Sequence, residues 1–173
     1  GFRNPIRLSF DRAGNGDIFV SGVAEAFWET VYWVDRQGNY GWSIREGTHC
    51  YDRARAFDPP KTCSRHGALG EAITDPIIEY PNWSVMRKES AVKATPLGTA
   101  NIGGFMYRGS ALPKLKGKFV FGDFSSQIMK PSVQLFVATP SNEWRAPWGV
   151  NRLKQLDVRI HSLAEDAYGE LYV

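Results

Sequence analysis

The sequence lacks three features that would define whole classes of protein. It has almost no excess of one charge, with 21 Lys and Arg against 18 Asp and Glu, which excludes a dedicated basic nucleic-acid binder and an acidic disordered tail. It has no run approaching the roughly 18 apolar residues of a membrane-spanning helix. It also has no window of about 11 residues that keeps a helical apolar period without Gly or Pro. Helix is therefore expected to be a minor element.

The composition points instead to one β-rich domain. The 173 residues are 43% hydrophobic and 13% aromatic, and they include 17 Gly, 10 Pro and 6 Trp. A chain of this length can bury one sizeable core but is too short for two ordinary domains. The Gly and Pro content favours many tight turns, so we expect a single all-β domain over residues 1–173.

Short apolar runs that follow turn residues are the clearest local pattern. The turn at 11–17, for example, leads into a run rich in β-forming residues. The predicted strands lie at 18–20, 31–34, 118–121, 134–138 and 171–173. Two long connections, at about 43–76 and 81–101, are rich in Pro, Gly, Ser, Thr and charged residues and show no clear period.

A weak internal repeat indicates how these strands are organised. The pattern at 10–20 recurs at 163–173, which is 153 residues later, and residues 119–121 lie about two-thirds of the way between the copies. Units of about 50 residues fit four-stranded propeller blades. The chain would then hold about three and a half blades of a propeller that needs more to close, and we expect a segment truncated at both ends. A β-sandwich with coincidental turn similarity is the alternative.

The two cysteines lie in the first long connection. Twelve residues separate Cys50 from Cys63, and a disulfide closing such a loop would contribute about 3 kcal/mol. A zinc site is the alternative, because His49 and His66 lie beside them, although only Cys63 and His66 have the usual spacing. Two free thiols are the third possibility. The disulfide is favoured, and it implies an oxidising compartment, periplasmic or secreted.

The second long connection contains a glycosylation sequon, Asn82-Trp83-Ser84. An Asn-X-Ser triplet is an acceptor for N-linked glycans in the eukaryotic secretory pathway. Asn82 is therefore a candidate modification site that agrees with the disulfide interpretation.

A series of motifs resembles the glucose/sorbosone dehydrogenase family. The matching segments run in family order nearly from end to end: 1–5 (GFRNP), 10–11 (FD), 38–42 (GNYGW), 45–50 (REGTHC), 75–80 (DPIIEY), 103–109 (GGFMYRG), 121–125 (FGDFS) and 169–173 (GELYV). The resemblance implies a six-bladed β-propeller, of which this chain is roughly the later half, and dependence on pyrroloquinoline quinone (PQQ). The same signature occurs in hedgehog-interacting-protein-like members, some of which are binding proteins and not enzymes.

The resemblance also implies cofactor contacts. In the family, an Arg and an Asn at the positions of Arg3 and Asn4 contact the quinone, and an Arg fork suits its three carboxylates. A surface Arg in a turn is the alternative interpretation of Arg3. Weaker candidates are Thr99 and Asn101, just before the expected strand at 103–104, and Lys130 and Arg159, near later blade tops. For each of these four, a solvated loop residue is the alternative interpretation.

The calcium that accompanies the quinone in the family is bound by a loop whose sequence differs here. Where the family reads Gly-Asp-Val-Gly-Gln, this chain reads Ser-Gly-Val-Ala-Glu at 21–25. Backbone carbonyls survive such changes, so Ala24 and Glu25 are candidate calcium ligands, with Glu29 as an acidic neighbour. However, Ala adopts a positive φ less readily than Gly.

The catalytic base of the family is a His from an earlier blade, so His49, His66 and His161 are not assigned that role. Two functions remain open. The first is a PQQ-dependent sugar dehydrogenase that passes a hydride from a sugar hydroxyl to the quinone, with a cytochrome or quinone as electron acceptor. The second is a non-catalytic propeller that binds a protein or a glycan. In both, the rest of the propeller is an expected partner.

Overall fold

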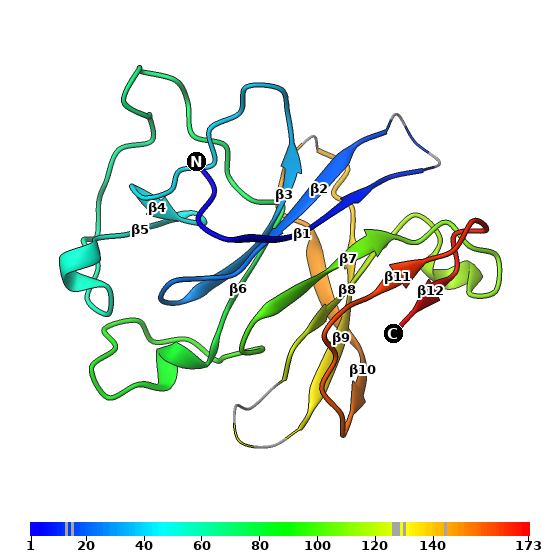
Figure 1. Ribbon diagram of the computed structural model, residues 1–173. Coiled ribbons are helices and arrows are strands. Elements are labelled where there is room, and N and C mark those ends of the chain that lie inside the picture. Colours follow the sequence, from blue (N-terminus) through cyan, green and yellow to red (C-terminus); the bar gives the residue numbers. More distant parts are fainter. Residues whose placement is uncertain (13, 15, 126–128, 130, 144) are drawn as a thin grey trace.

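The computed structural model describes residues 1–173 except 13, 15, 126–128, 130 and 144. Within these residues the secondary structure is almost entirely strand, which confirms the all-β prediction (Figure 1). The first four-stranded antiparallel sheet contains β1 (Pro5–Phe10), β2 (Ile18–Gly22), β3 (Trp28–Val34) and β6 (Ile78–Pro81). The second contains β7 (Asn101–Met106), β8 (Phe119–Asp123), β9 (Val133–Thr139) and β10 (Gly149–Leu156).

Shorter elements complete the described chain. Two hairpins are formed by β4 (Arg45–Glu46) with β5 (His49–Cys50) and by β11 (Ala164–Glu165) with β12 (Leu171–Tyr172). The 3-10 helices are η1 (Arg53–Arg55), η2 (Trp83–Met86) and η3 (Pro113–Leu115). In each four-stranded sheet the strands lie side by side in chain order. This up-and-down order is that of a propeller blade, whereas most β-sandwiches contain Greek-key connections.

The internal repeat marks the turn before the second strand of each unit. Gly16, Gly117 and Gly169 each lie two positions before β2, β8 and β12, and their φ angles are +75°, +78° and +80°. Glycine adopts this left-handed conformation without the steric cost of a Cβ atom. These three strands begin at residues 18, 119 and 171, so the first interval is about twice the second.

The unequal spacing changes the number of blades. The hairpin β4–β5 and the helices η1 and η2 are inserted before and after β6 and lengthen the first unit. The described residues therefore hold two complete four-stranded sheets and the further hairpin β11–β12, fewer than the three and a half blades that a uniform period of about 50 residues predicts.

An aromatic core joins the two large sheets. Phe19 of β2 contacts Phe119 of β8, with ring centroids 5.3 Å apart, and Tyr80 of β6 lies against Phe121 and Phe136. A second cluster, which includes Ile102, Val133, Ile160 and Leu163, connects the second sheet to the segment that leads into β11. The sheets therefore pack in series, as consecutive blades do.

One face of β1 is apolar and exposed. Ile6, Leu8 and Phe10 are 49%, 50% and 54% exposed, and because they alternate along the strand they share one face. Arg7, on the opposite face, packs against Gly103 of β7. The exposed face suits packing against a further sheet, as the resemblance predicts.

The cysteines form the predicted disulfide. Cys50 and Cys63 are bonded, with Cα atoms 5.6 Å apart, and neither is free. The zinc and free-thiol alternatives are therefore wrong, and no cluster of three or more metal-binding side chains occurs among the described residues. A separate finding is that no helix in the described part of the chain is long and apolar enough to cross a membrane.

Reducing this disulfide should lower the free energy of unfolding by about 3 kcal/mol. The closed loop limits the conformations of the unfolded chain, and opening it raises the conformational entropy of the unfolded state. Denaturant titrations with and without reductant, and of the variant Cys50→Ser/Cys63→Ser, measure the change. Coincident unfolding curves for the oxidised and reduced protein would contradict this expectation.

Candidate functional site

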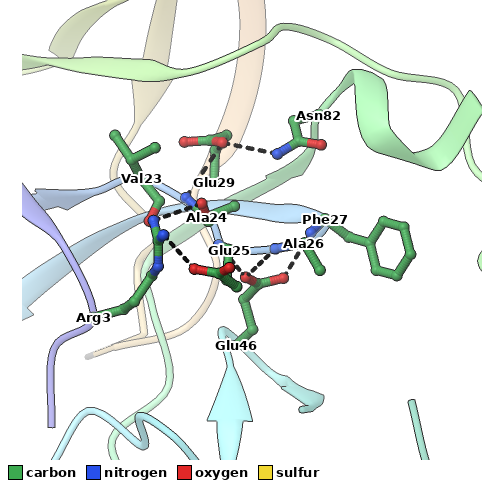
Figure 2. A network of polar contacts seen from close by, with 9 residues as sticks. All are labelled: Arg3, Val23, Ala24, Glu25, Ala26, Phe27, Glu29, Glu46 and Asn82. Carbon is green, nitrogen blue, oxygen red and sulfur yellow. Dashed lines mark hydrogen bonds and ion pairs between the residues drawn. The ribbon is translucent and has the colours of Figure 1, made fainter. Parts of the chain in front are cut away.

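Arg3 lies just before β1 and reaches the loop that follows β2 (Figure 2). Its Nη1 atom donates to the carbonyl oxygens of Val23, at 3.2 Å, and Ala24, at 2.8 Å. Its Nη2 atom forms an ion pair with the carboxylate of Glu25. The Arg3 and Glu25 side chains are 31% and 41% exposed. We call Arg3, the two carbonyls and Glu25 the Arg3 clamp, and its one positive and one negative side chain neutralise each other.

The carboxylate of Glu46, from β4, holds the same loop from the other side. It accepts hydrogen bonds from four successive backbone N–H groups, those of residues 25 to 28, at 2.6, 2.9, 2.7 and 3.1 Å. The Glu46 residue is only 6% exposed. Because buried N–H groups are costly to leave without an acceptor, this single side chain fixes the shape of the loop that carries the clamp.

Glu29, in β3, is a fully buried carboxyl group that links both sheets. Its oxygens accept from the Asn82 side chain at 3.0 Å, from the Asn101 backbone N–H at 2.9 Å and from the Ala24 N–H at 3.3 Å. Desolvation outweighs these hydrogen bonds and raises the pKa of Glu29 from 4.5 to about 8. Glu29 is therefore a structural group whose oxygens face protein donors.

These contacts bear on the predicted calcium ligands. The Ala24 carbonyl already accepts from Arg3, the Glu25 carboxylate pairs with Arg3, and Glu29 is buried among N–H donors. A calcium ion takes six to eight oxygen ligands in proteins. In this arrangement the residues do not fit such an ion, because a guanidinium group holds the carbonyl that calcium would need.

The structure separates the predicted cofactor residues. Asn4 is exposed and lines a small cavity of about 30 Å³ with Arg3. Thr99 donates to Asp123 and to the Ser125 carbonyl. Asn101 is buried, donates to the Thr30 carbonyl and accepts from the Gly103 N–H. Arg159 is exposed and lies over the Phe124 ring. Lys130 lies outside the described residues. Of the predicted cofactor residues that the structure describes, Arg3 and Asn4 meet at one cavity.

The predicted glycosylation site has an internal role. Asn82 is 6% exposed, its side-chain oxygen accepts from the Ser84 N–H at the start of η2, and its side-chain nitrogen donates to Glu29. This nitrogen is the atom to which an N-linked glycan attaches. Because this nitrogen is buried and faces Glu29, a glycan has no room there, so the folded arrangement argues against modification at this position.

The raised pKa of Glu29 predicts that the protein is less stable at high pH. The folded state keeps a proton that the unfolded chain loses above pH 4.5, so the contribution of this group is fully present below pH 4.5 and is lost as the pH rises to about 8. One such proton gives a slope of at most about 1.4 kcal/mol per pH unit. Burial also raises the pKa of Asp123, which acts in the same direction.

Denaturant unfolding of wild type and of Glu29→Gln across this pH range tests the assignment. The glutamine has a similar shape and does not titrate, so the difference between the two pH profiles isolates Glu29. We expect the wild type to lose stability relative to the variant as the pH rises. Parallel profiles would show that Glu29 is ionised in the folded protein over the whole range.

Fold and site together define a partial, propeller-like all-β protein whose loop after β2 is closed by an internal ion pair. No family model matches the chain. It is similar to the HIPL2 protein of Arabidopsis thaliana, with 26% identity over 134 residues, which are 78% of this chain and 17% of that protein. It is also similar to the HIPL1 protein of the same plant, with 27% identity over 142 residues, or 82% and 18%.

The chain thus spans less than a fifth of the length of these relatives. At this level of identity the similarity supports the resemblance stated from the sequence as a distant family likeness. It does not single out a particular dehydrogenase. What the whole protein does is therefore a matter for a proposal.

Proposed function

We propose that this chain belongs to a non-catalytic propeller that serves as a binding module, of the hedgehog-interacting-protein-like type. The observation that carries the proposal is the Arg3 clamp. The guanidinium group of Arg3 holds the carbonyls of Val23 and Ala24, and Glu25 supplies its counter-charge. A protein cation here takes the oxygens that would bind calcium, and the Arg that would face the quinone is already paired.

The sequence change in the loop agrees with this interpretation. Glu25 stands where the family has Gln, and a carboxylate neutralises an Arg whereas an amide does not. Glu29 and Asn101 are buried and bonded within the protein, which leaves neither side chain exposed to a ligand. The disulfide is in keeping with a periplasmic or secreted location. The ligand class in this proposal is a protein or a glycan.

Reconstitution with PQQ and excess calcium tests the proposal. We expect the purified protein to retain no quinone after gel filtration, as measured by its absorbance, and to show no dye-linked oxidation of aldoses. A PQQ-dependent dehydrogenase treated in the same way is the positive control. Retention of one quinone per protein chain would contradict the binding-module proposal.

The second candidate is a PQQ-dependent sugar dehydrogenase. It is favoured by the position of Arg3 and Asn4, which remain together on one cavity wall, and by the family likeness. When bound, the quinone would accept the hydride of the sugar, and calcium would hold it in place. This function requires Arg3 to leave Val23, Ala24 and Glu25 and to turn its fork toward a cofactor carboxylate. Quinone retention that is lost in Arg3→Ala would support it.

A further inference from the structure

Arg45 is a buried cation without a carboxylate partner in the described part of the chain. It lies in β4 and is 6% exposed. One of its terminal nitrogens donates to the Thr48 carbonyl, and its buried Nε atom has no hydrogen-bond partner. Burying a charge is costly unless it is paired. This guanidinium group therefore has unused capacity for an acceptor.

Carboxylates along the same stretch of chain are committed to other donors. Glu46 accepts from four backbone N–H groups, as described above. Glu79 accepts from the Thr48 N–H at 2.6 Å and from Nε2 of His49 at 3.0 Å. Asp75 is paired with Arg65. An acceptor for Arg45 would therefore have to come from outside these groups.

Among the described residues, Arg45 lines a small cavity and a larger one, and the larger one has room for more than a water molecule. The cavity that it shares with Arg3 has a volume of about 30 Å³, which suits a water molecule. The other has a volume of about 320 Å³ and is lined in part by the disulfide-closed loop. We call the second cavity the loop pocket. A small ligand that reaches Arg45 would occupy the loop pocket.

The charges of the loop pocket have one sign. Its lining includes Arg45, Lys61 and Arg65 but no Asp or Glu, and Arg65 is paired with Asp75 outside the lining. The hydroxyl-bearing residues Thr48 and Thr62 also line it. Guanidinium and ammonium groups with nearby hydroxyls are the donors that proteins use for oxyanions. The polar lining is therefore that of an anion site.

The remaining lining of the loop pocket is mainly aromatic and apolar. Trp28 stacks on His49, with ring centroids 3.7 Å apart and planes at 6°, and Nε2 of His49 is held by Glu79. Pro59, Pro60 and the Cys50–Cys63 disulfide form further wall. These apolar groups border the part of the loop pocket that Arg45 lines.

We infer that the loop pocket binds a small oxyanion, the carboxylate or sulfate group of a ligand, with Arg45 as the principal contact and Lys61 as a second. The inference rests on the proposed binding function and specifies the chemistry of its ligand. A carboxylate and a sulfate share the acceptor geometry that a guanidinium fork recognises. The body of the ligand would lie against Trp28 and the prolines.

Isothermal titration with sodium sulfate and, separately, sodium benzoate at constant ionic strength tests this inference. We expect saturable binding of at least one of the two anions to wild type. A preference for one of them shows whether the ligand carries a sulfate or a carboxylate group. Arg45→Met should lower the affinity by about tenfold to a hundredfold, since hydrogen bonds to charged groups are strong ones. Lys61→Gln should lower it severalfold.

The controls separate this inference from a general salt effect. Arg55→Gln removes an exposed Arg that does not line the loop pocket and pairs with Asp52, so it should bind like wild type. Lys61 is exposed, so its variant should fold even if Arg45→Met does not. No saturable binding of either anion, or equal affinity in wild type and Lys61→Gln, would overturn the inference. Neither result bears on quinone retention, which tests the proposed function separately.

Discussion

Replacing Glu46 by alanine should destabilise the protein by about 4 to 6 kcal/mol. The carboxylate accepts hydrogen bonds from the backbone N–H groups of residues 25 to 28, and it is buried. Its removal leaves four donors without an acceptor, and each buried unsatisfied group costs about 1 to 3 kcal/mol. Partial access of water to the loop keeps the expected total near the lower part of that range.

Equilibrium denaturation of Glu46→Ala measures this effect. Glu89→Ala is a matched control, because Glu89 is an exposed glutamate that pairs with Arg87, and such surface pairs contribute about 0 to 1 kcal/mol. Glu46→Gln should lie between the two, because it retains one carbonyl oxygen and turns an N–H₂ group toward backbone donors. A loss below about 1 kcal/mol in Glu46→Ala would show that the loop does not depend on this carboxylate.

Asp123→Ala should destabilise the protein by about 4 kcal/mol. Asp123 is fully buried at the end of β8 and accepts from the backbone N–H groups of Thr99, Ala100 and Ser125 at 2.7, 3.1 and 3.1 Å. It also accepts from the Tyr80 hydroxyl at 2.7 Å, which ties the second sheet to β6 of the first. The substitution removes all of these acceptors at once.

Tyr80→Phe is the partial control for this prediction. It removes only the hydroxyl donor and leaves the ring against Phe121 and Phe136. A single hydrogen bond to a charged acceptor contributes about 1.5 to 3 kcal/mol, so the loss should be clearly smaller than in Asp123→Ala. Equal losses in both variants, measured by denaturant unfolding, would mean that the backbone contacts of Asp123 contribute nothing.

The sequence predicted the strands whose signals are local. The runs at β2, β3, β8 and β9 consist of apolar and aromatic residues, and turns rich in Gly, Asn or Asp adjoin β2, β3 and β8. The strand β10 was missed because its burial pattern is almost wholly exposed, so it shows no apolar run. The blade count was too high because a uniform period does not reveal an insertion into the first unit.

The candidate site was predicted less well, because its contacts join residues far apart in the chain. Arg3 and the loop at 21–25 were singled out, but their pairing with each other was not. Glu46 acts on backbone N–H groups 18 to 21 residues away, and a glutamate that serves backbone donors has no local signature. Asn82 was predicted as a glycosylation acceptor and Asn101 as a cofactor contact, because the sequence does not reveal their bonds to Glu29 and Thr30.

The Arg3 clamp also explains why the Arg-Asn motif allows two interpretations from the sequence alone. An Arg beside an Asn suits a carboxylate-rich cofactor, and the same Arg suits two carbonyls and a glutamate. In this fold Glu25 lies beside Arg3 and forms an ion pair with it (Figure 2). The local charge balance, not the motif itself, therefore carries the functional conclusion.

Calcium titration followed by calorimetry tests the central claim, that Arg3 takes the place of a metal ion at the loop after β2. We predict that the wild-type protein binds no calcium below about 1 mM, the weak end of the range for protein sites. Arg3→Ala frees the carbonyls of Val23 and Ala24 and the Glu25 carboxylate, so the variant should bind calcium more tightly than the wild type, near that millimolar limit. Saturable one-site binding of calcium to the wild type at micromolar concentration would contradict the account.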